Sequence, residues 1–126
     1  MKIAIETDTK IVGVVEWVTV KGEKGTKTVK AKLDTGAFRT SVDFKVASEV
    51  GLGPVVDTVK VRSAVAANSE TRALVEAEII IHQQRFGLPV SVDDRSRMKY
   101  TVLIGRDLLE KSNFLINPRK IVEDEN

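Results

Sequence analysis

The residues with the clearest capacity for chemistry are three in a row, Asp34, Thr35 and Gly36. A carboxylate can take up or release a proton, and a threonine hydroxyl can both donate and accept a hydrogen bond. Glycine allows the backbone to turn tightly and lets another group approach closely. An isolated Asp-Thr-Gly triplet is more often an ordinary β-turn. Two further features of the sequence favour a catalytic loop.

The first feature is a second apolar run, residues 101–104, which ends at Gly105 and Arg106. The second is the separation of the two motifs, since 105 − 34 gives 71 positions. That length is enough for two or three hairpins that fold back and bring Gly105 beside Asp34. The pair of motifs is therefore much more specific than either motif alone.

Together, these motifs closely resemble the retropepsin-type aspartic proteases, whose Asp-Thr-Gly-Ala loop packs against a later apolar-apolar-Gly-Arg segment. Within that group the chain looks most like the small bacterial and archaeal proteins labelled "ATP-dependent zinc protease", which are often associated with RimK-type ligases. The resemblance covers most of the chain. It is carried, in the family's order, by residues 32–41, 92–98, 103–109 and 114–118.

The resemblance implies a role for each residue of the first motif. Asp34 is the expected catalytic acid, and Gly36 is expected to orient its carboxylate through the backbone N–H. Thr35 is expected to reach across a dimer and lock two loops together, with Ala37 supporting the site. All four residues lie at the end of a strand predicted from alternating apolar and polar residues.

The second motif is expected to support the site from below. Gly105 would let the later strand pack under the loop, and Arg106 would pair with an acid or a carbonyl group. The sequence departs from the retroviral pattern here, because those enzymes keep an acid four positions after the catalytic aspartate. Phe38 stands at that place and is followed by Arg39. The partner of Arg106 is therefore open at this stage.

A single Asp-Thr-Gly loop predicts a homodimer. Amide hydrolysis by acid–base catalysis needs one carboxylate and one neutral carboxylic acid, and two carboxyl groups at close range can share one proton. A two-fold axis would place Asp34 beside the Asp34 of a second copy, with an interface formed by the loops and the terminal strands. We therefore expect a homodimeric aspartic endopeptidase that hydrolyses peptide bonds with a water activated by this dyad.

Two other functions remain open. The same fold and dimer could serve a non-proteolytic peptide-binding or scaffolding module. Residues 63–70, the segment expected to close over a bound peptide as a flap, contain no aromatic residue. The chain could also be a purely structural β-domain in which the motifs occur by accident. Cleavage by the wild type and by an Asp34 variant separates the first two functions.

The predicted fold is all-β: a closed retropepsin-like barrel with one or two short helices, in a single domain spanning residues 1–126. Residues 119–126 are expected to be a frayed acidic tail. Helices are predicted over residues 44–50, capped by Asp43 and stopped by Gly51, and over residues 108–111, capped by Asp107. The predicted strands are residues 2–6, 11–20 with an interruption at Gly13, 26–33, 40–42, 55–62, 71–82, 85–92 and 100–104, and residues 114–116, which return to the sheet.

The segment between two of these strands, residues 63–70, is rich in small residues. We expect it to be a flap over the site, although a plain surface loop is the alternative. The expected flap residues are Ala64, Val65, Ala66, Ala67 and Asn68.

The composition excludes several kinds of chemistry. The chain has no cysteine, which excludes disulfides and thiolate chemistry, and His82 is its only histidine. A zinc site would need carboxylates almost alone, and no His-Glu-x-x-His motif or phosphate-binding P-loop is present. We therefore expect no metal and no cofactor.

Charge and hydropathy set the expected partners and compartment. The net charge of +2 is too small to imply nucleic acid, and no apolar run approaches the length of a signal peptide core or a membrane span. The expected partners are a second copy of the chain and a peptide or protein substrate, with no membrane. We expect a cytoplasmic protein.

Overall fold

Runs in which apolar residues alternate with polar ones form most of the structure, a computed structural model that describes residues 8–62 and 69–122. Within those residues the helices are α1 (Phe44–Val50) and α2 (Arg106–Leu109). The strands are β1 (Lys10–Val12), β2 (Val15–Gly22), β3 (Gly25–Leu33), β4 (Ser41–Asp43), β5 (Val55–Arg62), β6 (Ser69–Ile81), β7 (Gln84–Asp93), β8 (Val102–Ile104) and β9 (Phe114–Ile116). No helix in the described ranges is long and apolar enough to cross a membrane.

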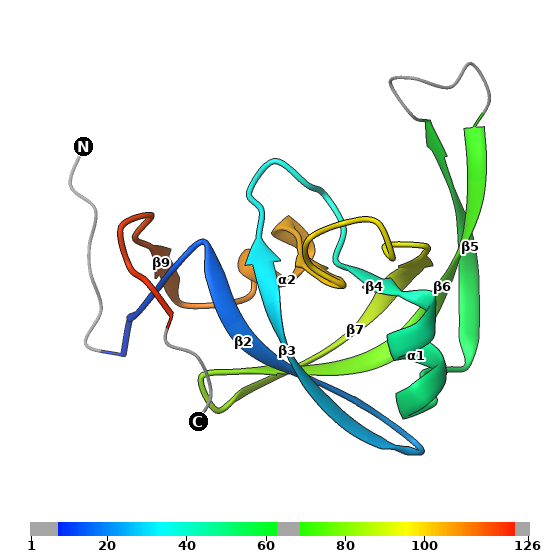
Figure 1. Cartoon of the computed structure of the whole chain (residues 1–126), viewed down its shortest axis with the longest axis horizontal. Coiled ribbons are helices and arrows are strands. Elements are labelled where there is room, and N and C mark those ends of the chain that lie inside the picture. The colour runs from blue at the N-terminus through cyan, green and yellow to red at the C-terminus, as the bar shows by residue number, and fades with distance from the viewer. Residues whose placement is uncertain (1–7, 63–68, 123–126) are drawn as a thin grey trace.

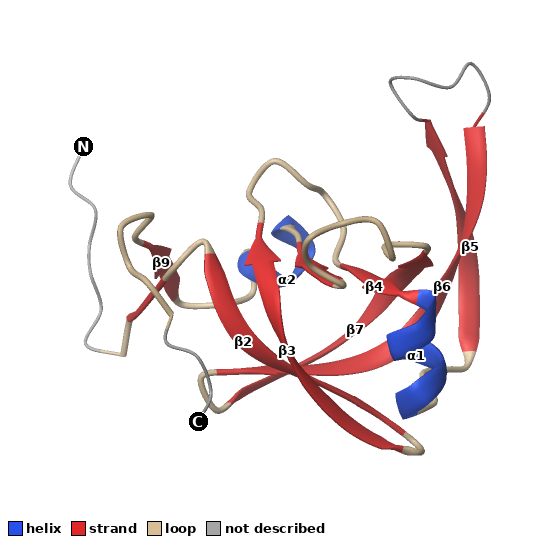
Figure 2. Ribbon diagram, viewed as in Figure 1, coloured by secondary structure: helices blue, strands red, loops and turns tan. Residues whose placement is uncertain are grey.

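Six strands close into a barrel, because β2 pairs with β3 along one edge and with β6 along the other. The order around the barrel is β2-β3-β8-β4-β7-β6, and β5 pairs with β6 outside this ring. Strands outweigh helices throughout (Figure 2), and the β5–β6 hairpin projects beyond the barrel (Figure 1). The expected all-β closed barrel with two short helices is confirmed.

The barrel interior is filled by aliphatic side chains on the inward face of each strand. Ala31 and Leu33 of β3 are buried while Lys32 between them is exposed, which is the alternation predicted from the sequence. Val102 and Ile104 of β8 are fully buried against them. The two strands run parallel, with Leu33 beside Ile104, so the chain leaves both strands at the same edge of the sheet.

Helix α1 has the predicted bounds and the predicted signals at both ends. The Asp43 carboxylate accepts a hydrogen bond from the Lys45 N–H at 3.0 Å, and Gly51 follows the helix with a φ of 69°. Val46, Ala47 and Val50 form its buried face. The helix therefore covers one side of the barrel while its cap joins it to β4.

Helix α2 differs from the prediction. It begins at Arg106 rather than at residue 108, so Asp107 lies inside its first turn and is not its N-cap. The N-cap is Gly105, which has no side chain to accept the helix N–H groups. The reason is long-range: the Asp107 carboxylate is engaged by Thr40, 67 positions earlier in the chain.

The strand predicted over residues 11–20 is broken into β1 and β2 near Gly13, where an interruption was expected. A side chain at Gly13 would lie 2.9 Å from the Lys120 carbonyl oxygen, so the C-terminal segment crosses the chain at this point. β1 pairs in parallel with β9 in a separate two-stranded sheet, whereas β9 was expected to return to the main sheet. The predicted strand over residues 2–6 lies outside the described residues.

Candidate active site

Asp34 sits at the point where β3 leaves the barrel, and three backbone contacts fix its position. Its own N–H donates to the Ile104 carbonyl of β8 at 2.8 Å, and its carbonyl accepts from the Ala37 N–H at 3.2 Å. The Gly36 N–H donates to Asp34 Oδ1 at 2.9 Å. Asp34 Oδ2 has no hydrogen-bond donor among the described residues. The side chain is half-buried, so one carboxylate oxygen is held and the other can receive a ligand.

The residues 34–40 between β3 and β4 form a loop, here called the Asp34 loop. Gly105 lies directly under this loop, and no larger residue fits there. A Cβ atom at Gly105 would lie 2.5 Å from the Arg39 carbonyl carbon and 2.7 Å from its oxygen. Both are backbone atoms, so the contact could be relieved only by moving the loop. Close backbone packing at this position therefore requires glycine.

Thr40 and Asp107 connect the loop to α2, and the sequence analysis did not assign either residue to the site. Thr40 is fully buried, and its hydroxyl donates to Asp107 Oδ1 at 2.7 Å. The same hydroxyl accepts from the Gly105 N–H at 3.1 Å, and the Thr40 N–H also donates to the Asp107 carboxylate at 3.0 Å. This network ties the loop after Asp34 to the end of β8.

The Arg106 side chain has two partners, which answers the question left open by the sequence. Its guanidinium donates through Nη1 to the Thr35 carbonyl at 3.1 Å, and its centre lies 5.8 Å from the centre of the Phe38 ring. Its backbone N–H donates to the Ala37 carbonyl at 2.9 Å. Phe38 thus stands where an acid was expected and offers Arg106 its ring face instead.

The structure brings Asp34, Thr35, Gly36, Ala37, Gly105 and Arg106 together at one edge of the barrel. The Thr35 residue is exposed, and the described contact of this residue to Arg106 is through its carbonyl. The expected role of its hydroxyl needs a second copy and stays a prediction. The expected flap residues 64–68 lie outside the described residues, so the structure does not place them relative to Asp34.

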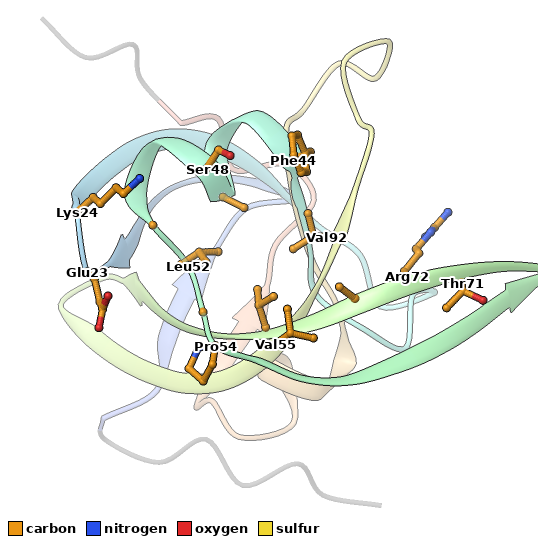
Figure 3. Close-up of a pocket in the computed structure, with 15 residues that line it drawn as sticks. Glu23, Lys24, Phe44, Ser48, Leu52, Pro54, Val55, Thr71, Arg72 and Val92 are labelled. Atoms are coloured by element: carbon orange, nitrogen blue, oxygen red, sulfur yellow. The ribbon is translucent and has the colours of Figure 1, made fainter.

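A pocket of about 440 Å³ opens beside the Asp34 loop. Ala37 and Phe38 of the loop line it together with side chains from β4, β5, β6, β7 and β8. A larger pocket of about 690 Å³ lies between α1, the turn after β2 and the strands β5 and β6 (Figure 3), and it includes no residue of the loop. A substrate must reach the Asp34 carboxylate, so the smaller pocket is the candidate cleft.

Arg95 is a residue of this pocket to which the sequence analysis assigned no role. Only 8% of its surface is exposed, its N–H donates to Asp43 Oδ1 at 2.8 Å and its Nε donates to the Tyr100 carbonyl at 3.1 Å. Burial lowers the pKa of Arg95, and the nearby carboxylates, Asp93 foremost and Asp34 among them, partly offset that effect. A buried cation therefore lies within electrostatic reach of Asp34.

The zinc that the "zinc protease" label suggests does not fit the only histidine. His82 Nε2 lies 3.3 Å from Glu16 Oε2, and the other oxygen of that carboxylate accepts from the Lys120 ammonium at 3.0 Å. An ammonium group beside a single histidine and a single carboxylate is not a zinc donor set. The described residues contain no cluster of three or more metal-ligating side chains.

Comparison of the sequence with known families identifies one that spans most of the chain. The RimB-like family, described as "Retropepsin-like aspartic endopeptidase RimB", matches residues 45–125, which are 81 of the 126 residues. The chain belongs to the RimB-like family. The match begins after the Asp34 loop, so it is independent of the first motif. No curated protein sequence matches the chain.

Solved structures show the same fold as this RimB-like chain. Lpg0085 of Legionella pneumophila subsp. pneumophila str. Philadelphia 1, a DUF785 protein with unknown function, has a TM-score of 0.59 at 20% identity, covering 89% of this chain and 95% of its own. EIAV protease complexed with the inhibitor HBY-793 has a TM-score of 0.55 at 13% identity, covering 86% and 93%. Simian Foamy Virus (mac) protease has a TM-score of 0.53 at 15% identity, covering 78% and 97%.

These comparisons confirm the resemblance to retropepsin-like proteases on which the sequence analysis rested. At these identities the solved structures show the fold alone. The label "ATP-dependent zinc protease" has no counterpart among them. The chemistry of the chain must therefore be argued from its own residues.

Proposed function

We propose that the chain is a homodimeric aspartic endopeptidase that hydrolyses peptide bonds with a water held between two Asp34 carboxyl groups. The observation that carries this proposal is the geometry of Asp34, whose Oδ1 is held by the Gly36 N–H while Oδ2 has no donor among the described residues. A second Asp34 across a two-fold axis would supply the group that shares a proton with Oδ2. Family membership and fold support the same activity.

In the proposed reaction, the ionised carboxylate of the pair removes a proton from water as the water oxygen attacks the peptide carbonyl. The protonated carboxyl group donates a hydrogen bond to the carbonyl oxygen, which gains negative charge in the transition state. A proton then passes to the leaving amine, the C–N bond breaks, and the pair is left with one proton as before. Two carboxyls and one water are sufficient for this cycle.

The interface would form around the Asp34 loops, with β1 and β9 beside them. These two strands already pair with each other within one chain, so they would join the interface as a preformed two-stranded sheet. Phe38 in the loop is 62% exposed, which leaves an aromatic surface for a second copy or a substrate to cover.

The test is cleavage of a mixed peptide library by the wild type and by Asp34→Asn across a range of pH, with the dimer affinity of each measured by sedimentation. Asp34→Asn keeps the shape of the side chain and removes both the charge repulsion and the general base. We expect this variant to dimerise at least as well as the wild type near neutral pH and to lose cleavage. The wild type should work best on the acidic side of neutrality.

Cleavage that survives in Asp34→Asn would remove Asp34 from the mechanism. A wild type that is dimeric by sedimentation but cleaves no peptide at any pH would favour the alternative function, a dimeric peptide-binding or scaffolding module with this fold. Those two outcomes separate the chemistry of the site from its assembly.

A further inference from the structure

The small sheet formed by β1 and β9 is not paired with any strand of the barrel. Within the described part of the chain, these two strands pair only with each other. They lie at the end of the molecule opposite α1 (Figure 1). The side chains that hold this sheet against the barrel therefore also set the position of the two strands that we expect at the dimer interface.

The carboxylate of Glu16 on β2 binds both ends of this small sheet. Its Oε1 accepts from the Gly13 N–H at 2.8 Å and from the Lys120 ammonium at 3.0 Å. The same ammonium donates to the Ile11 carbonyl of β1 at 3.0 Å. Gly13 follows β1 and Lys120 follows β9, so one carboxylate, in a residue that is only 3% exposed, joins both strands to the barrel.

His82, in the turn between β6 and β7, lies at the other oxygen of this carboxylate. Its Nε2 is 3.3 Å from Glu16 Oε2, and its ring meets Phe114 of β9 edge to face, with 6.2 Å between the ring centres. The imidazole is 34% exposed, so it can exchange a proton with water. His82 thus contacts both the anchoring carboxylate and the anchored sheet. Glu16, Lys120 and His82 are here called the Glu16 clasp.

The charge of the clasp changes with a single proton, the one on His82. A cavity of about 530 Å³ opens beside the clasp, and the three clasp residues are the only charged groups on its wall among the described residues. The next charged side chain on the same hairpin, Arg85, pairs with Glu78 at 3.7 Å. Burial raises the pKa of Glu16, but a backbone N–H, Lys120 and His82 hold it below its ordinary value. Glu16 therefore stays ionised over the range of about pH 5 to 8 in which imidazoles gain a proton.

We propose that the Glu16 clasp is a pH-sensitive device in which protonation of His82 holds the β1–β9 sheet more tightly against the barrel. A neutral imidazole offers Glu16 one weak hydrogen bond, whereas an imidazolium adds a positive charge beside a buried carboxylate. Lys120 binds the other oxygen, so the two cations meet different sides of the carboxylate. Releasing the sheet would expose the carboxylate to water and weaken this attraction, so the proton favours the held state.

The consequence for the dimer rests on the proposed function, whereas the hold on the sheet does not. If the β1–β9 sheet forms part of the interface, acid strengthens the dimer from a site outside the Asp34 pair. The two effects are separable in Asp34→Asn, which removes the shared proton of that pair. His82 is the only histidine of the chain, so no other imidazole titrates in this variant.

Amide hydrogen exchange of Asp34→Asn, followed by NMR, measures the hold on the sheet. The reporting amides are those of Lys10, which donates to the Asn113 carbonyl, and of Asn117, which donates to the Val12 carbonyl. Protection factors correct for the pH dependence of exchange itself, and amides of the β2–β3 hairpin are the internal reference. We expect roughly threefold higher protection of the sheet at about pH 5.5 than at about pH 7.5, the range of a partly exposed ion pair.

Two variants should remove this pH dependence, and a matched control should keep it. His82→Asn removes the titrating group, and asparagine tolerates the left-handed backbone at this position, where φ is 49°. Glu16→Gln removes the carboxylate charge and keeps the test valid if His82→Asn fails to fold. Gln83→Asn changes the neighbouring turn residue, where φ is 66°, and leaves the clasp intact.

Sedimentation of Asp34→Asn at the same two pH values measures the effect on the dimer. Each dimer contains two clasps, so a threefold effect in each protomer lowers the dissociation constant by up to roughly tenfold in acid. The double variant Asp34→Asn/His82→Asn should show no such change.

Equal protection of the sheet amides at both pH values in Asp34→Asn would overturn the clasp, and so would a pH dependence that His82→Asn leaves unchanged. A pH-dependent hold on the sheet with an unchanged dissociation constant would overturn its link to the dimer. If Asp34→Asn stays monomeric at every concentration while protection still depends on His82, the proposed homodimer fails and the clasp stands.

Discussion

Thr40→Val tests whether a single buried hydroxyl joins the Asp34 loop to β8 and α2. The substitution keeps the size and shape of the side chain and removes only its hydrogen bonding. Two bonds are lost: the donation to the Asp107 carboxylate at 2.7 Å and the acceptance from the Gly105 N–H at 3.1 Å. Thr40 and Gly105 are both buried, so water does not readily replace the hydroxyl as acceptor of the Gly105 N–H.

The expected loss follows from these two bonds. A hydrogen bond to a charged group contributes roughly 1.5–3 kcal/mol, and an unsatisfied buried N–H costs roughly 1–3 kcal/mol. The Thr40 N–H still binds Asp107, so the carboxylate keeps one partner in the loop and the two terms do not add fully. We expect Thr40→Val to lower the free energy of unfolding by about 3 kcal/mol, a large fraction of the roughly 5–15 kcal/mol typical of a folded protein.

Urea unfolding at one fixed protein concentration measures this loss, because a dimer's stability depends on concentration. Thr40→Ser keeps the hydroxyl and loses a buried methyl group, so it should cost only about 1 kcal/mol. Thr19→Val is the second control, because the Thr19 hydroxyl forms an exposed hydrogen bond with the Thr28 hydroxyl. This substitution should change the free energy of unfolding by less than about 0.5 kcal/mol. If Thr40→Val lowers the free energy of unfolding by no more than Thr40→Ser does, the hydrogen bonds of the Thr40 hydroxyl do not stabilise the fold, and the reasoning is refuted.

Three further predictions concern the same structure. Gly105→Ala should lower the free energy of unfolding by about 2 kcal/mol or more and abolish cleavage, because its Cβ would lie 2.5 Å from the Arg39 carbonyl carbon. Thermal unfolding measures the first effect and a peptide cleavage assay measures the second. Arg106→Lys keeps the charge but loses the planar group that binds a carbonyl and faces a ring, so kcat/KM should fall by roughly tenfold, and an unchanged value would contradict this role. Burial of Glu16 opposes its ionisation, but donation from a backbone N–H and from Lys120 outweighs it, so its pKa lies below the ordinary 4.5. Its stabilising effect is therefore present above that value and lost as pH falls through the lowered pKa, and chemical unfolding of Glu16→Gln should show a deficit near neutral pH that narrows in acid.

The parts of the fold that the sequence predicted well are those set by neighbouring residues. Helix α1 has an Asp43 cap, an apolar face and a Gly51 stop within nine positions of one another, and its bounds were correct. The β-hairpin ending at Leu33 follows equally from alternation and two glycines. Each of these signals acts over a few residues, so a single sequence contains all the information needed to read it.

The parts that were wrong depend on residues far apart in the chain. Asp107 was predicted to cap α2 because it precedes an apolar run, but Thr40 engages its carboxylate and the helix begins earlier. Gly13 was expected only to interrupt a strand, whereas the approach of Lys120 makes it a crossing point between the two ends of the chain. Capping and turn rules consider only residues that are close in the sequence. They cannot include a partner that the barrel fold brings close from another part of the chain, so these outcomes required the structure.

The sequence singled out Asp34 through its motif, and the hydrogen-bond donors in the structure distinguish it from the two neighbouring acids, Asp43 and Asp107. The Asp43 carboxylate accepts from the N–H groups of Lys45 and Arg95, one at each oxygen, and that of Asp107 accepts from Thr40 and from the N–H of the next residue. Both oxygens of each of these two carboxylates are therefore already engaged within the protein. Asp34 has one donor and one open oxygen. A general base needs an open oxygen within reach of water, so among these three acids only Asp34 is arranged to exchange a proton with a substrate or with a second copy of itself.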